Sequence, residues 1–135
     1  MIHHHEIKVR GFHTDMFGHV NNARYLELLE EARWELLEQH MNYNKWAELG
    51  TAFIVVNINI SYRNPAKLGD ILDIQSAIAK LGGKSGTVHQ EIYLKGTEIK
   101  AAEADVTFVI IDVKTNKAIK IEGEMYQVLS NLVEK

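Results

Sequence analysis

The chain has 135 residues, of which 46% are apolar and 24% are charged, and its formal net charge is −3. This length and composition fit one globular domain over residues 1–135, because two separate cores would each be marginally stable at this size. The slight acidic excess gives no reason to expect a nucleic-acid partner, which requires a clear surplus of lysine and arginine. It also provides no long-range attraction for an anionic substrate, so any recognition of phosphate must be local.

Several kinds of site and segment are not expected from this sequence. There is no cysteine, which excludes disulfides, a thiol nucleophile and zinc sites built on thiolates, and is compatible with a reducing cytoplasm. The first residues lack the basic start and apolar core of a secretory leader. No apolar run reaches the length of a membrane span. We therefore expect a soluble, cytoplasmic protein without a membrane partner.

The first predicted element is a half-buried strand from about Glu6 to Phe12, where apolar and basic residues alternate. The run His3-His4-His5 precedes it. These histidines could bind a metal, but a short terminal run of this kind is more typical of a disordered or added segment. Because no paired carboxylates accompany it, we predict no required metal.

A long helix is predicted from Ala23 to about His40, because apolar residues recur there at steps of three and four. Asn21 or Asn22 is a natural N-cap, since an asparagine side-chain oxygen can accept a hydrogen bond from an unpaired first-turn amide. A helix of about 18 residues is roughly 27 Å long, which is long for so small a domain. A helix this broadly apolar requires other elements wrapped around it.

The rest of the chain is mostly strand, after a short helix near Lys45–Leu49. Gly82-Gly83-Lys84 predicts a hairpin turn, and the other connections are also too short for helical crossovers. The predicted fold class is therefore α+β, the hotdog fold, in which a curved antiparallel sheet wraps around one long central helix. The predicted strands are 53–62, 70–80, 85–95, 100–113 and 118–121, followed by a helical tail at 124–133.

The loop before the long helix holds the residues most informative about chemistry. Asp15 lies shortly before the predicted first turn at Asn22, and Gly18 permits tight backbone geometry between them. A helix N-terminus presents unpaired N–H groups and about half a positive charge. Such amides can stabilise the oxyanion that forms when a carbonyl becomes tetrahedral. An aspartate in this position is also a common cap or turn residue, so spacing alone leaves both interpretations open.

The same segment carries a family resemblance. Asp15-Met-Phe-Gly-His-Val-Asn-Asn-Ala-Arg-Tyr25, followed by Glu30-Glu-Ala-Arg33 and Leu81-Gly-Gly-Lys-Ser-Gly86, resembles the 4-hydroxybenzoyl-CoA thioesterase family of hotdog enzymes. The resemblance covers nearly the whole chain and, within the family, points to the long-chain acyl-CoA thioesterases of fatty-acid degradation. It implies hydrolysis of acyl-CoA, with a medium or long fatty chain, to free acid and CoA without a cofactor.

The resemblance also implies roles for single residues. The family's catalytic aspartate falls on Asp15, which would act as nucleophile or as general base on water. The family's oxyanion donor falls on the backbone amide of Asn22. A helix tyrosine of the family falls on Tyr25, whose role is more typical of packing than of chemistry. Many members have a second acid two residues before the catalytic one, where this chain has His13.

The histidines near this loop are further candidates. His13 could tune Asp15 or carry a proton to the departing thiol, and His19 could orient Asp15 or line the pocket. A purely structural role also suits each of them. Glu31 on the long helix is interpreted as structural or solvated, although related hotdog lineages use a helical glutamate as catalyst.

Other residues are candidates for binding the substrate. Gly18 would shape the site, while Arg63 and Lys84 could contact a CoA phosphate. The glycines around Lys84 lack the spacing of a phosphate-binding loop, so a hairpin is the better interpretation there. Some large apolar residues could line an acyl channel, although core packing is the default for each; they are Tyr25, Leu29, Trp34, Trp46 and Phe53.

Two alternative functions remain open at this stage. One is a non-catalytic hotdog module that binds acyl-CoA. The other is an enoyl-thioester hydratase, which would need a paired histidine and carboxylate such as His13 and Asp15. One domain of this size has too little surface to enclose CoA and a long acyl chain, so we expect a homodimer or homotetramer with sites built across two chains.

Overall fold

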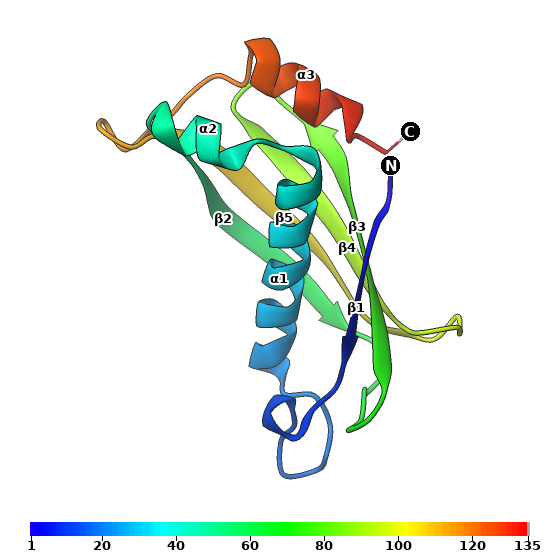
Figure 1. Cartoon of the computed structure of the whole chain (residues 1–135). Coiled ribbons are helices and arrows are strands. Elements are labelled where there is room, and N and C mark those ends of the chain that lie inside the picture. The colour runs from blue at the N-terminus through cyan, green and yellow to red at the C-terminus, as the bar shows by residue number, and fades with distance from the viewer. Residues whose placement is uncertain (135) are drawn as a thin grey trace.

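The computed structural model describes residues 1–134, in which a long helix lies across one face of a six-stranded antiparallel sheet (Figure 1). The strand order is β1-β3-β4-β5-β2, and the short β6 pairs with β5. This confirms the predicted curved sheet around a central helix. The strands are β1 (His3–Lys8), β2 (Thr51–Tyr62), β3 (Ile71–Leu81), β4 (Ser85–Leu94), β5 (Lys100–Asp112) and β6 (Lys117–Ala118); the helices are α1 (Asn22–His40), α2 (Tyr43–Glu48) and α3 (Gly123–Asn131).

Helix α1 begins where the sequence predicts, and its N-cap is Asn21. The Asn21 side chain accepts a hydrogen bond of 2.9 Å from the Ala23 amide. The helix lies closest to β1 and β3. Ala102 and Ala104 of β5 are also buried. The buried residues of α1 are Tyr25, Leu28, Leu29, Ala32 and Leu36.

Strand β2 forms one edge of the sheet and pairs only with β5 among the described strands. Several of its apolar side chains stay exposed, and α1 lies closest to β1 and β3, at the opposite edge of the sheet. An edge strand with unpaired backbone groups is a template for pairing with another chain. The exposed side chains are Ile54 (40%), Val55 (42%), Val56 (56%) and Ile58 (37%).

The histidine run is part of the sheet, so its prediction as a disordered segment is wrong. His3 pairs with Ser76 of β3 in register, and His3 is buried. The side chains of His3 and His5 both contact one oxygen of Glu35 on α1, at 3.1 Å for His3 Nε2. Strand pairing and this shared carboxylate fix the segment, and neither is visible from a run of identical residues.

Other predicted boundaries shift by a few residues. The first strand ends at Lys8 rather than Phe12, because the chain then turns through a short 3-10 helix at Gly11–His13. The strand predicted at 118–121 is only the two-residue β6. The hairpin at 82–84 is confirmed between β3 and β4. Within residues 1–134, no helix has both the length and the apolar character needed to cross a membrane.

Candidate active site

The loop from Asp15 to His19 is held in a tight turn by Asp15 itself. Its Oδ1 accepts hydrogen bonds from the Phe17 amide at 2.9 Å and the His19 amide at 3.3 Å. The Asp15 amide donates to the His19 carbonyl at 2.8 Å, and the Gly18 amide donates to the Asp15 carbonyl at 3.0 Å. Gly18 has a φ of +75°, in the left-handed region that favours glycine. The turn therefore positions one carboxylate oxygen through amides of its own loop.

Backbone hydrogen bonds fix this loop relative to its neighbours. The Val20 amide donates to the Ala66 carbonyl at 2.8 Å, and the Asn21 amide donates to the His13 carbonyl at 2.9 Å. Because Asn21 is also the N-cap of α1, the Asp15 turn and the helix start are held together as one unit. The spacing of Asp15 and Asn22 in sequence thus becomes a defined arrangement in space.

A hollow of about 290 Å³ opens between this unit and the end of β2. It brings together five of the residues that the sequence selected: Asp15, His19, Asn22, Tyr25 and Arg63. Its remaining lining comes from Val20 and from a segment that the sequence did not select, Tyr62, Asn64 and Pro65.

Asn22, which lines the hollow, is the first residue of the helix. Its N–H therefore has no acceptor within α1. None of the hydrogen bonds formed within residues 1–134 uses this N–H either. The N-cap side chain is already engaged by Ala23. An unpaired donor therefore lies at the positive end of a helix, on a residue that lines the same hollow as Asp15.

Two tyrosines support the helix start. The Tyr62 hydroxyl donates to the Asn22 carbonyl at 3.1 Å, and its ring lies 5.5 Å from that of Tyr25. Tyr25 is 3% exposed, and burial raises the pKa of its phenol. It therefore stays neutral and packs, in agreement with its predicted role. Tyr62 ends a strand far away in sequence, and no local pattern signals its contact with Asn22.

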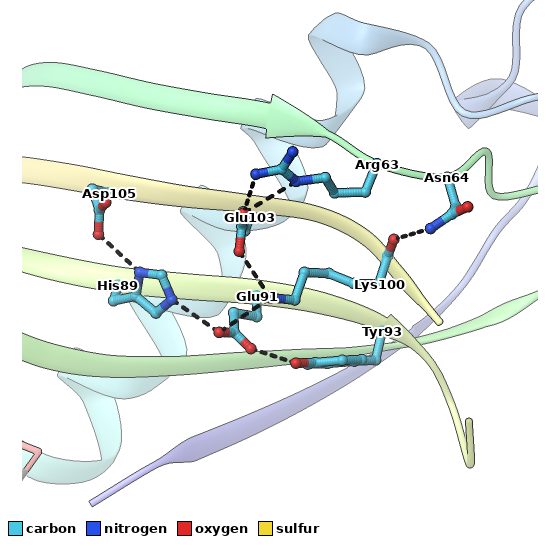
Figure 2. Close-up of polar contacts among 8 residues, drawn as sticks. All are labelled: Arg63, Asn64, His89, Glu91, Tyr93, Lys100, Glu103 and Asp105. Atoms are coloured by element: carbon cyan, nitrogen blue, oxygen red, sulfur yellow. Dashed lines mark hydrogen bonds and ion pairs between the residues drawn. The ribbon is translucent and has the colours of Figure 1, made fainter. Parts of the chain in front are cut away.

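Arg63 lines the hollow but is tethered to the outer face of the sheet (Figure 2). Its Nε and Nη2 donate to one oxygen of Glu103 at 3.1 and 2.5 Å. Lys100 Nζ donates to the other Glu103 oxygen at 2.8 Å. Lys100, followed by Arg63, lowers the pKa of Glu103 to about 2. The Arg63 charge is thus partly balanced and held at the rim of the hollow.

The same face carries the closest approach to a metal site among residues 1–134. Ligand atoms of His89, Glu91 and Glu103 lie within 4.8 Å of one another. Lys100 Nζ already lies between the two glutamates, 3.5 Å from Glu91 and 2.8 Å from Glu103 (Figure 2). His89 also binds Asp105 through Nδ1 at 2.8 Å. The cluster is an ion network with its own internal cation.

These features accompany a clear family match. The model of the thioesterase-like superfamily matches residues 9–129. The chain belongs to this superfamily. It is 50% identical over 129 residues to the long-chain acyl-CoA thioesterase FadM of Escherichia coli K12, which covers 96% of this chain and 98% of the relative. It is 34% identical over 101 residues to an E. coli acyl-CoA thioester hydrolase, YbgC, covering 73% and 74% of the two chains.

A solved structure extends the match to three dimensions. The crystal structure of YbaW, a probable thioesterase from E. coli, matches 97% of this chain and 98% of its own. The TM-score is 0.89 and the sequence identity is 50%. The hotdog fold of this member of the thioesterase-like superfamily is therefore supported by its sequence, its own structure and a solved relative.

Two predicted site residues lie away from the hollow. His13 is 7% exposed and its Nδ1 accepts a hydrogen bond of 2.8 Å from the Arg10 amide. Burial, with Arg24 next in weight, lowers the pKa of His13 and keeps its ring neutral. His13 therefore closes the 3-10 turn and borders a separate groove between β1 and α1. The structure does not pair it with Asp15 across the hollow.

Lys84 is the second of these. It lies in the β3–β4 hairpin, at the end of the sheet that α3 adjoins, whereas the Asp15 loop lies at the opposite end (Figure 1). The 11 residues of β3 separate the two ends, a span of roughly 35 Å. Within one chain Lys84 is too distant to serve this hollow.

Proposed function

We propose that this protein hydrolyses acyl-CoA thioesters to a free carboxylic acid and CoA. The observation that carries the proposal is the shared hollow of the Asp15 carboxylate and the unpaired Asn22 amide. A nucleophile or base and an oxyanion donor are the two groups that thioester hydrolysis requires. The 50% identity to a long-chain acyl-CoA thioesterase supports the same substrate class.

The proposed reaction places the thioester carbonyl oxygen at the Asn22 N–H. Asp15 either attacks the carbonyl carbon or removes a proton from the water that attacks it. The negative charge then develops on the oxygen beside the amide, where one good donor lowers the barrier by about 3–4 kcal/mol. Collapse of the tetrahedral intermediate breaks the carbon–sulfur bond, and CoA leaves as the thiolate. If Asp15 is the base, this step already yields the free acid; if it is the nucleophile, water then cleaves the acyl–Asp15 anhydride to the free acid and the Asp15 carboxylate. The thioester needs no cofactor for this step because it is already activated.

The two carboxylate oxygens of Asp15 have different roles in this proposal. Oδ1 is held by the Phe17 and His19 amides. Oδ2 accepts no hydrogen bond from any group in the part of the chain that the structure describes. One oxygen is therefore fixed while the other is available for water or for the carbonyl carbon. His19 lines the hollow beside it and in this scheme orients the loop through its backbone rather than through its ring.

We further propose that the enzyme is a homo-oligomer, at least a dimer, and acts in the cytoplasm. The support for oligomer formation is β2, an edge strand of 12 residues with exposed Ile54, Val56 and Ile58. Pairing of β2 with a second copy would satisfy its unpaired backbone groups and cover part of this apolar surface. Size-exclusion chromatography with light scattering tests the assembly, and a monomer at micromolar concentration would contradict it.

The activity is tested by following thiol release from a panel of acyl-CoA substrates. Asp15→Asn removes the charge and should lower kcat by about 100- to 10,000-fold, the range for losing a positioned base. Asp112→Asn is the matched control, because Asp112 also holds its own turn, accepting from the Lys114 amide at 2.8 Å and the Thr115 amide at 3.4 Å. Thiol release that survives in Asp15→Asn would rule out this mechanism.

Two further outcomes are informative. Release from no acyl-CoA of any length, with retained binding, would favour the non-catalytic module. Rapid-quench mass spectrometry of the intact protein separates the two roles of Asp15. A nucleophilic Asp15 forms an acyl anhydride that adds the mass of the acyl group, whereas a general base leaves the protein mass unchanged.

A further inference from the structure

Asn64 is a polar residue of the hollow that the sequence gave no reason to select. It follows the end of β2 by two residues and lines the hollow together with Asp15 and Asn22. Its side-chain Nδ2 donates to the Lys100 carbonyl at 2.7 Å (Figure 2). Only the nitrogen of an asparagine amide can donate to a carbonyl, so Nδ2 is the atom that faces Lys100. The oxygen, Oδ1, is therefore the end of the amide that is left over.

The segment around Asn64 is fixed on both sides. Before and at this residue, two successive backbone amides donate to the same β5 carbonyl, at 2.8 and 3.2 Å. Pro65 has no N–H, so the chain cannot continue this pairing with β5. The next residue, Ala66, accepts a hydrogen bond of 2.8 Å from the Val20 amide, which belongs to the loop that follows Asp15. Asn64 thus lies at a corner that both β5 and the Asp15 loop hold in place.

Oδ1 of Asn64 has no partner in the part of the chain that the structure describes. None of the hydrogen bonds formed within residues 1–134 uses this atom. An amide oxygen has two lone pairs, and the amide cannot exchange its two ends without losing the bond to Lys100. Three residues of the hollow therefore keep unused hydrogen-bonding capacity. Asp15 keeps a charged acceptor, Asn22 keeps a donor, and Asn64 keeps a neutral acceptor.

The proposed reaction uses the first two of these groups but leaves the leaving group without a contact. The sulfur of CoA stands at the end of the pantetheine arm. The first amide N–H of this arm is separated from the thioester carbonyl carbon by four bonds, roughly 5 Å when extended. The hollow of about 290 Å³ holds roughly ten water-sized groups of about 30 Å³ each. It therefore has room for the thioester together with this amide, which is the N–H donor of the substrate nearest to the reacting carbon.

We propose that Asn64 Oδ1 accepts a hydrogen bond from the first amide N–H of the pantetheine arm, and that Asn64 thereby selects thioesters of CoA by their leaving group. This inference rests on the proposed thioesterase function. A neutral oxygen suits this position better than a carboxylate. The amide that it binds is neutral, and the nearby sulfur acquires negative charge as the carbon–sulfur bond breaks, so a second carboxylate beside Asp15 would repel it.

The attacking water is the other candidate partner of Oδ1. The amide is favoured because Oδ2 of Asp15 is already free to hold the water. Asn64 also comes from the end of β2, the wall that faces the unit formed by the Asp15 loop and the start of α1. The two roles have different kinetic signatures. A contact with the arm exists before and during the reaction and acts mainly on KM, whereas a contact with water acts on kcat for every thioester.

A pair of small thioesters that differ at one position tests the proposal. One is the acyl thioester of N-acetylcysteamine, which keeps the first amide of the arm. In the other, an ester oxygen replaces the amide N–H, so the shape is kept and the donor is lost. After correction for hydroxide-catalysed rates, we expect wild-type kcat/KM to be about three- to tenfold higher for the amide. Asn64→Ala should lower the amide value by the same factor, through KM, and reduce the difference between the two substrates to less than twofold.

Asn42→Ala is the matched control. Asn42 is also exposed and its side chain also makes one hydrogen bond with the backbone, accepting from the Lys45 amide at 3.1 Å. It follows the C-terminal end of α1, whereas the hollow adjoins the N-terminal end, roughly 28 Å away along the 19-residue helix. Asn42→Ala should keep the wild-type preference for the amide substrate. Urea unfolding of both variants checks that each is folded.

Each outcome decides a separate point. An equal loss on both thioesters in folded Asn64→Ala, expressed in kcat, would overturn the inference and assign Oδ1 to the water. Wild-type protein that hydrolyses both thioesters equally well would overturn it without any variant, while leaving the thioesterase function standing. Wild-type protein that releases thiol from no thioester, acyl-CoA included, would instead remove the proposed function on which the inference rests.

Discussion

The Asp15 loop and the outer face of the sheet both contain charged and polar groups. The two regions differ in whether these groups have hydrogen-bonding or ion-pair partners. On the outer face, Glu103 is bound by Arg63 and Lys100, and Glu91 is bound by Tyr93, His89 and Lys100. In the hollow, one oxygen of Asp15 and the amide of Asn22 have no partner among the described residues.

This difference separates stabilising groups from reactive ones. The outer face has the larger number of ionisable groups and the strongest lowering of a carboxyl pKa, at Glu103. Its charges are satisfied by one another, so little capacity remains for a ligand. The hollow has fewer such groups, but two of its lining residues, Asp15 and Asn22, keep an acceptor and a donor without a partner among the described residues. Unsatisfied hydrogen-bonding capacity, rather than charge density, marks the candidate site.

The largest predicted effect contrasts Asp15→Asn with Glu103→Gln. Asp15→Asn should lower kcat for acyl-CoA by about 100- to 10,000-fold. Glu103→Gln should leave kcat within about twofold, the usual range for a surface substitution away from the chemistry. Steady-state thiol release from one acyl-CoA measures both. A comparable loss in the two variants would place the outer network in the reaction and erase the distinction.

The second prediction compares the neighbouring asparagines at the helix start. Asn21→Ala removes the cap on the Ala23 amide and should lower the free energy of unfolding by about 1 kcal/mol. It should also lower kcat by roughly tenfold, because a loosened first turn misplaces the Asn22 amide. Asn22→Ala keeps that backbone N–H. It should lower the free energy of unfolding by less than about 0.5 kcal/mol and raise the activation free energy of hydrolysis by less than the same amount. Urea unfolding and thiol release measure the pair, and a larger activity loss in Asn22→Ala would point to the side chain.

The third prediction concerns acid. Glu103 has a folded-state pKa of about 2, lowered from 4.5 by Lys100 and Arg63. A lowered pKa means that this carboxylate stabilises the fold above pH 4.5 and that its contribution is lost as the pH falls toward 2. Glu103→Gln should therefore flatten the dependence of unfolding free energy on pH in this interval, by about 1 kcal/mol for a surface network. Urea unfolding at intervals from pH 2 to pH 6 measures it, and parallel curves would contradict it.

The smallest expected effect concerns His89, whose contribution to the stability of the fold decreases as the pH rises, whereas that of Glu103 increases. Burial acts to lower the pKa of His89, but its hydrogen bonds with Asp105 and Glu91 outweigh burial and raise it above 6.5. His89 therefore stabilises the fold below pH 6.5, and this contribution disappears as the pH rises through the folded-state pKa. His89→Gln should cost less than about 1 kcal/mol at pH 5.5 and nothing at pH 9. An NMR titration of the His89 ring checks the direction directly.

Local patterns were enough to predict most of the elements. The three-and-four spacing from Ala23 to His40 predicts α1, and the structure begins that helix at Asn22. The glycines at 82–86 predict a hairpin, which is confirmed. The structure adds why Gly86 must be glycine: a Cβ there would lie 2.5 Å from the ring of Phe108. That contact joins β4 to β5, so no pattern local to the turn contains it.

The candidate site could be predicted only in part. Asp15, Gly18 and Asn22 are close in sequence, and turn and helix-end physics connects them without tertiary information. Tyr62 reaches the same hollow from a strand 40 residues away, and its contact depends on the end of β2 meeting the first residue of α1. His13 and Lys84 were selected by residue type and position in sequence. In the fold, His13 is buried in the 3-10 turn, and Lys84 lies at the far end of the sheet.

The sequence by itself determined the helix, the strands, the superfamily and the pairing of Asp15 with a helix N-terminus, because each depends on periodicity or on neighbours along the chain. Only the tertiary structure decided that His3 and His5 bind Glu35, that Arg63 is tethered to Glu103, and that apolar side chains of β2 stay exposed. These features depend on which strands become neighbours and on how far one helix extends across a sheet. Hydrophobic periodicity shows which face of an element is apolar, but the partner that covers that face, or leaves it bare, is set by the whole fold.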